Sequence, residues 1–237
     1  MKCLLLADDR LDLLATLEPI LKHWGYRVLT ATNIDQANAF LAESTPAMLI
    51  IGSHLLAAPG LQLPYPALPI LALENPEASP LTTEASMTLT VPIDIFALFA
   101  FVQSRIEMHP RCNLRLRLRL PGMYSTQAED YVLADVLSLS MNGLFFRSPQ
   151  RFACGTRVTA IFPLLGLGKE LEVEGTVLYV IEPIPQNNYV QGFGLGFTAL
   201  STEQTILLER FIAGTFLDEV ATCQPGVGEF SSSQLRR

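Results

Sequence analysis

Residues 111–120 read RCNLRLRLRL, with leucine and arginine alternating from Leu114 onward. Alternation with a period of two is typical of a strand with one buried and one exposed face. The leucines would face a core, whereas Arg115, Arg117 and Arg119 would share the face that contacts water. The stretch therefore predicts a half-buried strand that carries a row of guanidinium groups on its outer side.

The arginines at the start of this strand predict an anion site. Arg111 lies four residues before Arg115, in a segment that Pro110 keeps extended. A guanidinium group is a planar fork that donates two parallel hydrogen bonds and stays charged at cellular pH, which suits a phosphate. We therefore expect Arg111 and Arg115 to turn toward one phosphorylated object.

A second polar segment follows at residues 138–143, which read SLSMNG. Ser138 and Ser140 offer short hydroxyl groups beside the backbone, and Gly143 permits a positive φ or a close backbone approach. We interpret the segment as a turn. Together with the arginines it predicts a site for a small phosphorylated ligand that has hydrogen-bonding edges.

Arg-x-x-x-Arg before a strand, followed later by a Ser-x-x-Gly turn, resembles the PilZ domain, and the resemblance covers about residues 110–220. It implies a ligand, cyclic di-GMP, whose phosphates and guanine would be gripped by Arg111 and Arg115. The turn residues Ser140 and Gly143 would hold the remaining edge. The sequence departs from the family at Ser138, where Asp or Asn is usual and has a longer reach. The ligand-binding set implied by the resemblance is Arg111, Arg115, Ser138, Ser140 and Gly143.

Charge is unevenly distributed over the 237 residues, a length that suits two domains. Residues 1–109 carry five basic and eleven acidic residues (net −6), and residues 110–237 carry eleven and twelve (net −1). A basic cluster on a nearly neutral domain favours a compact anion over the broad positive face that binds duplex nucleic acid. Single-stranded nucleic acid is also disfavoured, because residues 114–120 contain no aromatic residue for base stacking.

Cysteine spacing and hydropathy indicate in which cellular compartment the protein resides. The four cysteines form no C-x-x-C pair, which disfavours a metal knuckle or a disulfide scaffold and fits a reducing environment. The apolar start of the chain runs straight into Asp8 and Asp9, unlike a targeting segment. Apolar runs also fall well short of the ~18 residues of a membrane span. We therefore expect a cytoplasmic protein with no membrane insertion and no cofactor.

The first half of the sequence alternates between apolar runs and segments of helical periodicity. Alternation of this kind predicts a doubly wound α/β domain with a parallel sheet. The expected strands are 2–7, 26–31, 48–51, 69–73 and 87–91, and the expected helices are 11–24, 35–42 and 93–107. The proline-rich connection after the third strand leaves little room for a full helix.

This half resembles the receiver domain of bacterial response regulators, because Asp8 and Asp9 match the acidic pair that holds magnesium there. The resemblance also implies that its chemistry is missing. Gly52 stands where the phosphoaccepting aspartate belongs, Glu74 replaces the switch hydroxyl, and Val91 replaces the lysine. Phosphoryl transfer needs a carboxylate nucleophile, a bound metal and a neutralising cation. We interpret this half as a pseudo-receiver with no functional metal, serving as a dimerisation or docking platform.

After the motif the chain predicts an all-β domain that ends with a helix. Short strands separated by Gly, Pro and Asn turns favour an antiparallel β-barrel of the PilZ type. The expected strands are 131–137, 143–147, 157–163, 170–182 and 189–197, followed by a helix at 202–216. The predicted domains are a receiver-like domain at 1–108, a PilZ-like barrel at 109–220 and a disordered tail at 221–237.

Two hypotheses of function follow. In the first, the barrel binds cyclic di-GMP and the pseudo-receiver relays occupancy to a protein partner, with a homodimer as a further possibility. In the second, both domains have lost their chemistry and the chain is a ligand-free adaptor. An enzyme is not expected, because no nucleophile–base pair, metal set or catalytic carboxylate pair stands out.

Overall fold

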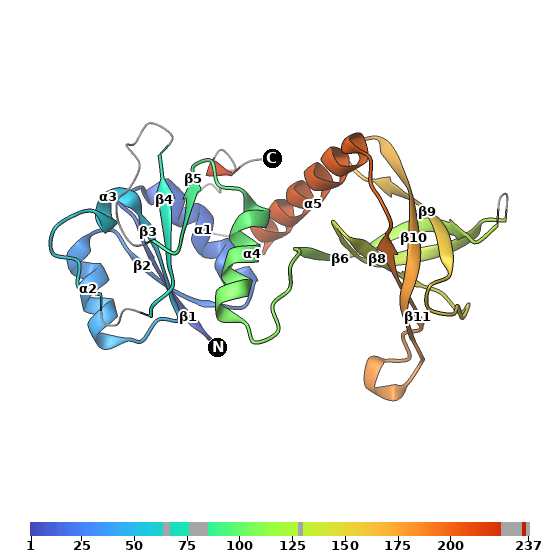
Figure 1. Cartoon of the computed structure of the whole chain (residues 1–237), viewed down its shortest axis with the longest axis horizontal. Helices are drawn as coiled ribbons and strands as arrows, with labels where there is room; N and C mark the ends of the chain where they lie inside the picture. The colour runs from blue at the N-terminus through green and yellow to red at the C-terminus, as the bar shows by residue number, and fades with distance from the viewer. Residues whose placement is uncertain (64–66, 76–84, 128–129, 224–233, 236–237) are drawn as a thin grey trace. The chain divides into compact units, whose positions relative to one another are not determined.

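The computed structural model describes residues 1–63, 67–75, 85–127, 130–223 and 234–235. The chain divides into two compact units (Figure 1). The first unit comprises Met1–Cys112 together with Leu217–Arg237, and the second comprises Asn113–Phe216.

The first unit is built on a five-stranded parallel sheet with the strand order β2-β1-β3-β4-β5. This order is one of the two common doubly wound arrangements, so the predicted α/β class is confirmed. The strands are β1 (Cys3–Ala7), β2 (Arg27–Ala31), β3 (Met48–Gly52), β4 (Ile70–Glu74) and β5 (Met87–Thr90), and the helices are α1 (Leu11–His23), α2 (Ile34–Glu43), α3 (Ser53–Leu56) and α4 (Ile95–Ile106).

Local sequence explains these elements. Every residue of β3 is buried, as expected for a central strand covered on both faces. The helix α1 is followed by Gly25 with φ +90°, a conformation that glycine adopts without strain. The side chain of Asn33 accepts a hydrogen bond from the Gln36 N–H and so caps the start of α2.

The connection after β3 is shorter than in a regular α/β unit. It begins with α3, a single turn, and no longer helix forms among the described residues of this connection. The prediction of little room for a full helix is therefore confirmed. Residues 64–66, within this connection, and 76–84, in the next, lie outside the described residues.

The second unit is a closed antiparallel barrel with the strand order β10-β11-β8-β7-β6-β9. The predicted barrel is confirmed. Its strands are β6 (Arg115–Ser125), β7 (Val132–Ser140), β8 (Gly143–Arg147), β9 (Arg157–Leu164), β10 (Lys169–Ile181) and β11 (Gly192–Phe197), with a short 3₁₀ turn at Pro185–Asn187.

Aromatic rings fill the barrel. The ring of Tyr124 lies 5.3 Å from that of Phe146 and 5.1 Å from that of Phe193, the second pair edge to face. The hydroxyl of Tyr124 meets the Ser148 hydroxyl at 2.6 Å, and burial raises the pKa of the tyrosine. A buried hydroxyl with a partner avoids the desolvation penalty of an unpaired one, so this layer fixes how β6, β8 and β11 pack.

The final helix, α5 (Thr202–Thr222), is longer than the predicted helix at 202–216. The predicted disordered tail lies mostly outside the described residues, at 224–233 and 236–237. Within the first unit, the Ile93 N–H donates to the Gln234 carbonyl at 2.8 Å, and Leu235 is buried in a parallel bridge with Ile93.

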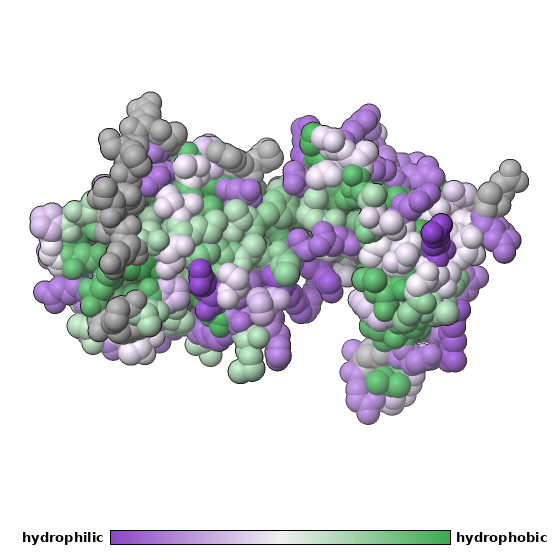
Figure 2. Space-filling model, viewed as in Figure 1, coloured by the Kyte–Doolittle hydropathy of each residue, from purple (hydrophilic) through white to green (hydrophobic). Residues whose placement is uncertain are grey.

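Apolar residues also remain on the surface of each unit. Figure 2 shows pale green, apolar atoms over the first half of α4, where Phe96, Ala97 and Ala100 are half-buried. On the second unit, Leu178 and Ile184 are exposed along β10 and the connection that follows it. No helix among the described residues is long and apolar enough to cross a membrane.

Candidate ligand site

The arginine row on β6 has the exposure that the alternation predicted. Arg115, Arg117 and Arg119 are exposed, while Leu116 and Leu120 are buried in the barrel. The Arg119 Nη2 lies 2.9 Å from the Asp135 Oδ2, so this arginine already has a counterion. Within the described part of the chain, Arg115 and Arg117 form no ion pair, which leaves their guanidinium groups available to an anion.

Ser138 and Ser140 lie on β7, not in a turn as the sequence interpretation had it. The ladder pairs Arg115 with Ser140 and Arg117 with Ser138, and Ser140 also pairs with Gly143 on β8. Directly opposite residues point to the same face of a sheet. Arg115, Ser140 and Gly143 thus form one row across three strands. The turn itself is only Met141 and Asn142, because the ladder continues to its last residues.

Within this row, Ser140 and Gly143 already make contacts that stabilise the barrel. The Ser140 Oγ donates to the Gly143 carbonyl at 3.1 Å, which closes the turn. A Cβ on Gly143 would lie 2.2 Å from the carbonyl oxygen of Leu195 on β11, so a close backbone approach explains this glycine. Ser138 is half-buried, and among the described residues its hydroxyl has no hydrogen-bond partner. Ser138 is therefore the hydroxyl of this segment that a ligand can use.

Arg111 belongs to the first unit, in the segment between α4 and β6, and its side chain is exposed. Its backbone N–H donates to the Gln103 Oε1 at 3.2 Å. The Gln103 Nε2 donates to the Tyr26 hydroxyl at 2.9 Å, and that hydroxyl donates to the Glu107 Oε1 at 3.1 Å. Burial and the Glu107 hydrogen bond raise the pKa of Tyr26, which keeps the hydroxyl protonated as a donor. This chain of hydrogen bonds anchors the backbone of Arg111.

The structure thus brings four of the five expected residues together on β6, β7 and β8 of the second unit, and it places the fifth, Arg111, in the first unit. Sequence reasoning missed Gln103. The only signal was its position on the expected helix 93–107, a few residues before the motif, and a glutamine there is ordinarily a surface residue.

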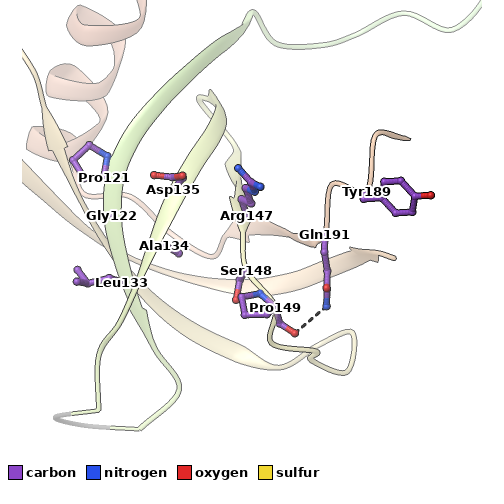
Figure 3. A pocket seen from close by; sticks show the side chains of 10 residues that line it. All are labelled: Pro121, Gly122, Leu133, Ala134, Asp135, Arg147, Ser148, Pro149, Tyr189 and Gln191. Atoms are coloured by element: carbon purple, nitrogen blue, oxygen red, sulfur yellow. Dashed lines mark hydrogen bonds between the residues drawn. The ribbon is translucent and has the colours of Figure 1, made fainter. Parts of the chain in front are cut away.

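A separate cavity of about 590 Å³ lies at the opposite end of β7 (Figure 3). None of the five expected residues lines it. Asp135 and Arg147, which pair across β7 and β8, lie on its wall. The other lining residues are Pro121, Gly122, Leu133, Ala134, Ser148, Pro149, Tyr189 and Gln191. The motif residues therefore lie outside this cavity.

The first unit gathers four residues that the receiver resemblance singled out at one edge of its sheet. Asp8 follows β1, Gly52 ends β3, Glu74 ends β4 and Val91 follows β5. All four lie at the carboxyl ends of parallel strands, the position at which such sheets bind ligands. Asp8 is completely buried, and Asp9 is exposed. These residues therefore lie together at one edge of the sheet.

Comparison with known proteins identifies the second half of the chain. The family model of the PilZ domain matches residues 108–214. No curated protein matches the chain.

Similar solved structures come from both families. The inhibitor of motility MotI/DgrA of Bacillus subtilis is 15% identical over 49% of this chain and 56% of its own length, with a TM-score of 0.42. This chain therefore spans little more than half of that protein. The PilZ domain of YcgR from Escherichia coli, solved with c-di-GMP, is 13% identical over 48% of this chain and 98% of its own, with a TM-score of 0.40. A signal receiver domain from Pseudomonas fluorescens is 22% identical over 45% of this chain and 94% of its own, with a TM-score of 0.40.

The motif arginines before and on β6, the short turn between β7 and β8, the closed barrel and the family match all fall in one segment. Residues 108–214 of this chain are a PilZ domain.

Proposed function

We propose that this chain is a regulatory protein that binds cyclic di-GMP through Arg111, Arg115, Ser138 and the Gly143 turn, and that it acts by binding and not by catalysis. The Ser140 hydroxyl stabilises the turn through its hydrogen bond to the Gly143 carbonyl. The functional domain is the barrel at 109–220. The observation that carries the proposal is the exposed guanidinium group of Arg115, which has no ion pair among the described residues and lies in the row that ends at the turn.

The chemistry of the ligand fits this row. Cyclic di-GMP offers two phosphates, and an arginine fork donates two hydrogen bonds to a phosphate or to the O6 and N7 of a guanine. The Ser138 hydroxyl and the backbone of the turn can meet the remaining polar edge. A cluster of like charges gains most from a compact dianion, because one ligand then neutralises several guanidinium groups at once.

Calorimetric titration of the purified chain with cyclic di-GMP tests the proposal, with GMP and cyclic di-AMP as matched ligands. We expect saturable binding of cyclic di-GMP, and little or none of the other two. Absence of binding at ligand concentrations near 1 mM, about −4 kcal/mol, would contradict it.

A first prediction concerns Ser138, the residue at which the family motif is altered. Ser138→Asp is expected to tighten binding of cyclic di-GMP by about tenfold, since a carboxylate accepts two hydrogen bonds from the N–H groups of a guanine. Because the introduced carboxylate would also lie opposite Arg117, the variant should be titrated in the Arg117→Ala background as well. Unchanged affinity in both backgrounds would place Ser138 outside the site.

We also propose that the first unit senses occupancy through the anchor of Arg111. Gln103 on α4 holds the backbone of a ligand-binding arginine and is itself held by the Tyr26 hydroxyl. The segment around Arg111 can have the hydrogen bond to Gln103 formed or broken. A ligand that binds one of these two arrangements more tightly shifts the equilibrium toward it, and this shift reports occupancy to the first unit. Such a relay requires neither phosphorylation nor a metal in the first unit.

A second prediction tests this anchor. Gln103→Leu removes both hydrogen bonds, and the loosened segment is expected to weaken binding of cyclic di-GMP by about five- to tenfold. Gln103→Glu keeps an acceptor for the Arg111 N–H and should stay within about twofold of wild type. Titration of both variants decides the point. Equal affinities for Gln103→Leu and wild type would exclude the anchor from ligand binding.

The ligand-free adaptor is the second candidate function, and two observations favour it. Ser138 is shorter than the usual Asp or Asn, and the hydroxyl of Ser140 is already used inside the turn. In this case the output would rest on surfaces such as the half-buried apolar residues of α4, through a protein partner or a second copy of the chain. The calorimetric titration separates the two candidates directly.

A further inference from the structure

The end of β1 contains an ion pair that the proposed function does not use. The buried Asp8 carboxylate receives both the Nε and the Nη2 of Arg10, at 2.7 Å to Oδ1 and 2.6 Å to Oδ2. The backbone N–H of Arg10 also donates to Oδ1 at 2.9 Å. Both carboxylate oxygens are therefore occupied by one residue, in the bidentate geometry that gives the strongest carboxylate hydrogen bonds.

The same guanidinium group extends to a neighbouring part of the sheet. Its Nη2 donates to the Leu73 carbonyl on β4 at 3.4 Å, and its Nη1 donates to the Asn75 side chain just beyond β4. Arg10 thus links the carboxyl end of β1 to that of β4. The hydrogen bond with Asp8 raises the pKa of Arg10, so the bridge is charged at any cellular pH.

Side chains also fill the end of β3, which lies between those two strands. A Cβ on Gly52 would lie 2.6 Å from the Asp8 Oδ2 and 2.7 Å from the His54 Cε1. The His54 Nε2 lies 3.0 Å from the Asp9 Oδ1. The space above β3 is therefore taken by Asp8 and His54, and even an alanine there would displace them.

Asp8, Asp9 and His54 have donor atoms within 4.8 Å of one another, a spacing that a cation could use. A hard cation needs oxygen atoms that are free to coordinate it, and a positive charge beside them repels it. Here both oxygens of the buried Asp8 carboxylate are already paired with the positively charged guanidinium group of Arg10.

We propose that the guanidinium group of Arg10 permanently takes the place of a divalent cation at Asp8, so that the first unit is held in one state without metal and without a phosphoryl group. Arg10 is then an internal counterion that locks the ends of β1 and β4 together. This inference does not depend on whether the barrel binds cyclic di-GMP.

Titration with Mn²⁺ tests the proposal on the full chain, with the signal of free Mn²⁺ followed by electron paramagnetic resonance. Wild type is expected to bind no Mn²⁺ up to millimolar concentration. Arg10→Ala is expected to bind it at least about tenfold more tightly than wild type, because both oxygens of Asp8 lose their bonds to the guanidinium group and the positive charge beside them. The double variant Arg10→Ala/Asp8→Asn is the matched control and should lose that gain.

Two results would overturn the proposal. One is saturable Mn²⁺ binding by wild type that Asp8→Asn removes, and the other is a folded Arg10→Ala that binds no more Mn²⁺ than wild type. If Arg10→Ala does not fold, Arg10→Gln, which removes the charge and keeps a donor, takes its place under the same criteria. Thermal melting of wild type in Mn²⁺ and in EDTA gives an independent readout, and equal melting temperatures are expected.

Discussion

Arg111→Ala and Arg115→Ala are each expected to weaken binding of cyclic di-GMP by about 100-fold. A guanidinium fork that grips a phosphate or a guanine makes two charge-assisted hydrogen bonds, and their loss costs about 3 kcal/mol, or roughly two decades in Kd. Titration calorimetry on each purified variant gives the change directly. Circular dichroism would show that the barrel stays folded, as an exposed side chain without an ion pair should allow.

Arg117→Ala is the matched control for Arg115→Ala. Arg117 lies two residues along the same strand, is also exposed, and also lacks an ion pair among the described residues. It stands outside the Arg-x-x-x-Arg motif, so its loss should change affinity by less than about threefold through general electrostatics alone. Equal losses at Arg115 and Arg117 would show that the row attracts anions without a defined site. Retained binding in both motif variants would refute the proposed ligand site.

Gly143→Ala is expected to destabilise the barrel by about 3 kcal/mol or more, the upper range for overpacking. The added Cβ would lie 2.2 Å from a backbone oxygen of β11, and a backbone atom in a closed barrel cannot swing aside as a side-chain tip can. The lost pairing would separate β8 from β11 next to the turn. Urea denaturation of the full chain, followed by circular dichroism, measures the change.

Gly214→Ala provides the opposite control. Gly214 lies within α5, and a Cβ there would meet nothing within 4 Å. Alanine favours a helix over glycine by about 0.5–1 kcal/mol, so this variant should be slightly more stable than wild type. A Gly143→Ala midpoint equal to that of wild type would contradict the close approach of β8 and β11.

The Arg/Leu alternation predicted the existence of β6, but the ends of the strands could not be read from it. β6 continues through Pro121 and Gly122 to Ser125, although both residues usually interrupt strands. The ladder with β7 shifts its register between Arg117 and Leu120 and then continues regularly through Pro121 and Gly122, and such pairing depends on the partner strand. The same ladder draws Ser138 and Ser140 into β7.

Side-chain contacts were harder to foresee than elements. The family pattern indicated Gly52 and Asp8, yet not that Arg10 would bind Asp8, because two residues in a β–α turn face each other only for certain turn geometries. The anchor between Gln103 and Arg111 joins residues eight apart, across the end of α4. Periodicity describes faces of regular elements, and both contacts lie where the regular elements end.

The two sheets differ in whether a strand from another chain can pair with one of their edge strands. Every strand of the barrel has two neighbours, so an extended peptide cannot join it by β-augmentation. The parallel sheet is open, and just beyond the end of β5 the chain itself places Leu235 in a bridge with Ile93. On the other side, β2 has β1 as its only partner among the described strands. The outer backbone groups of β2 therefore form one edge at which this chain can donate and accept main-chain hydrogen bonds to a second polypeptide.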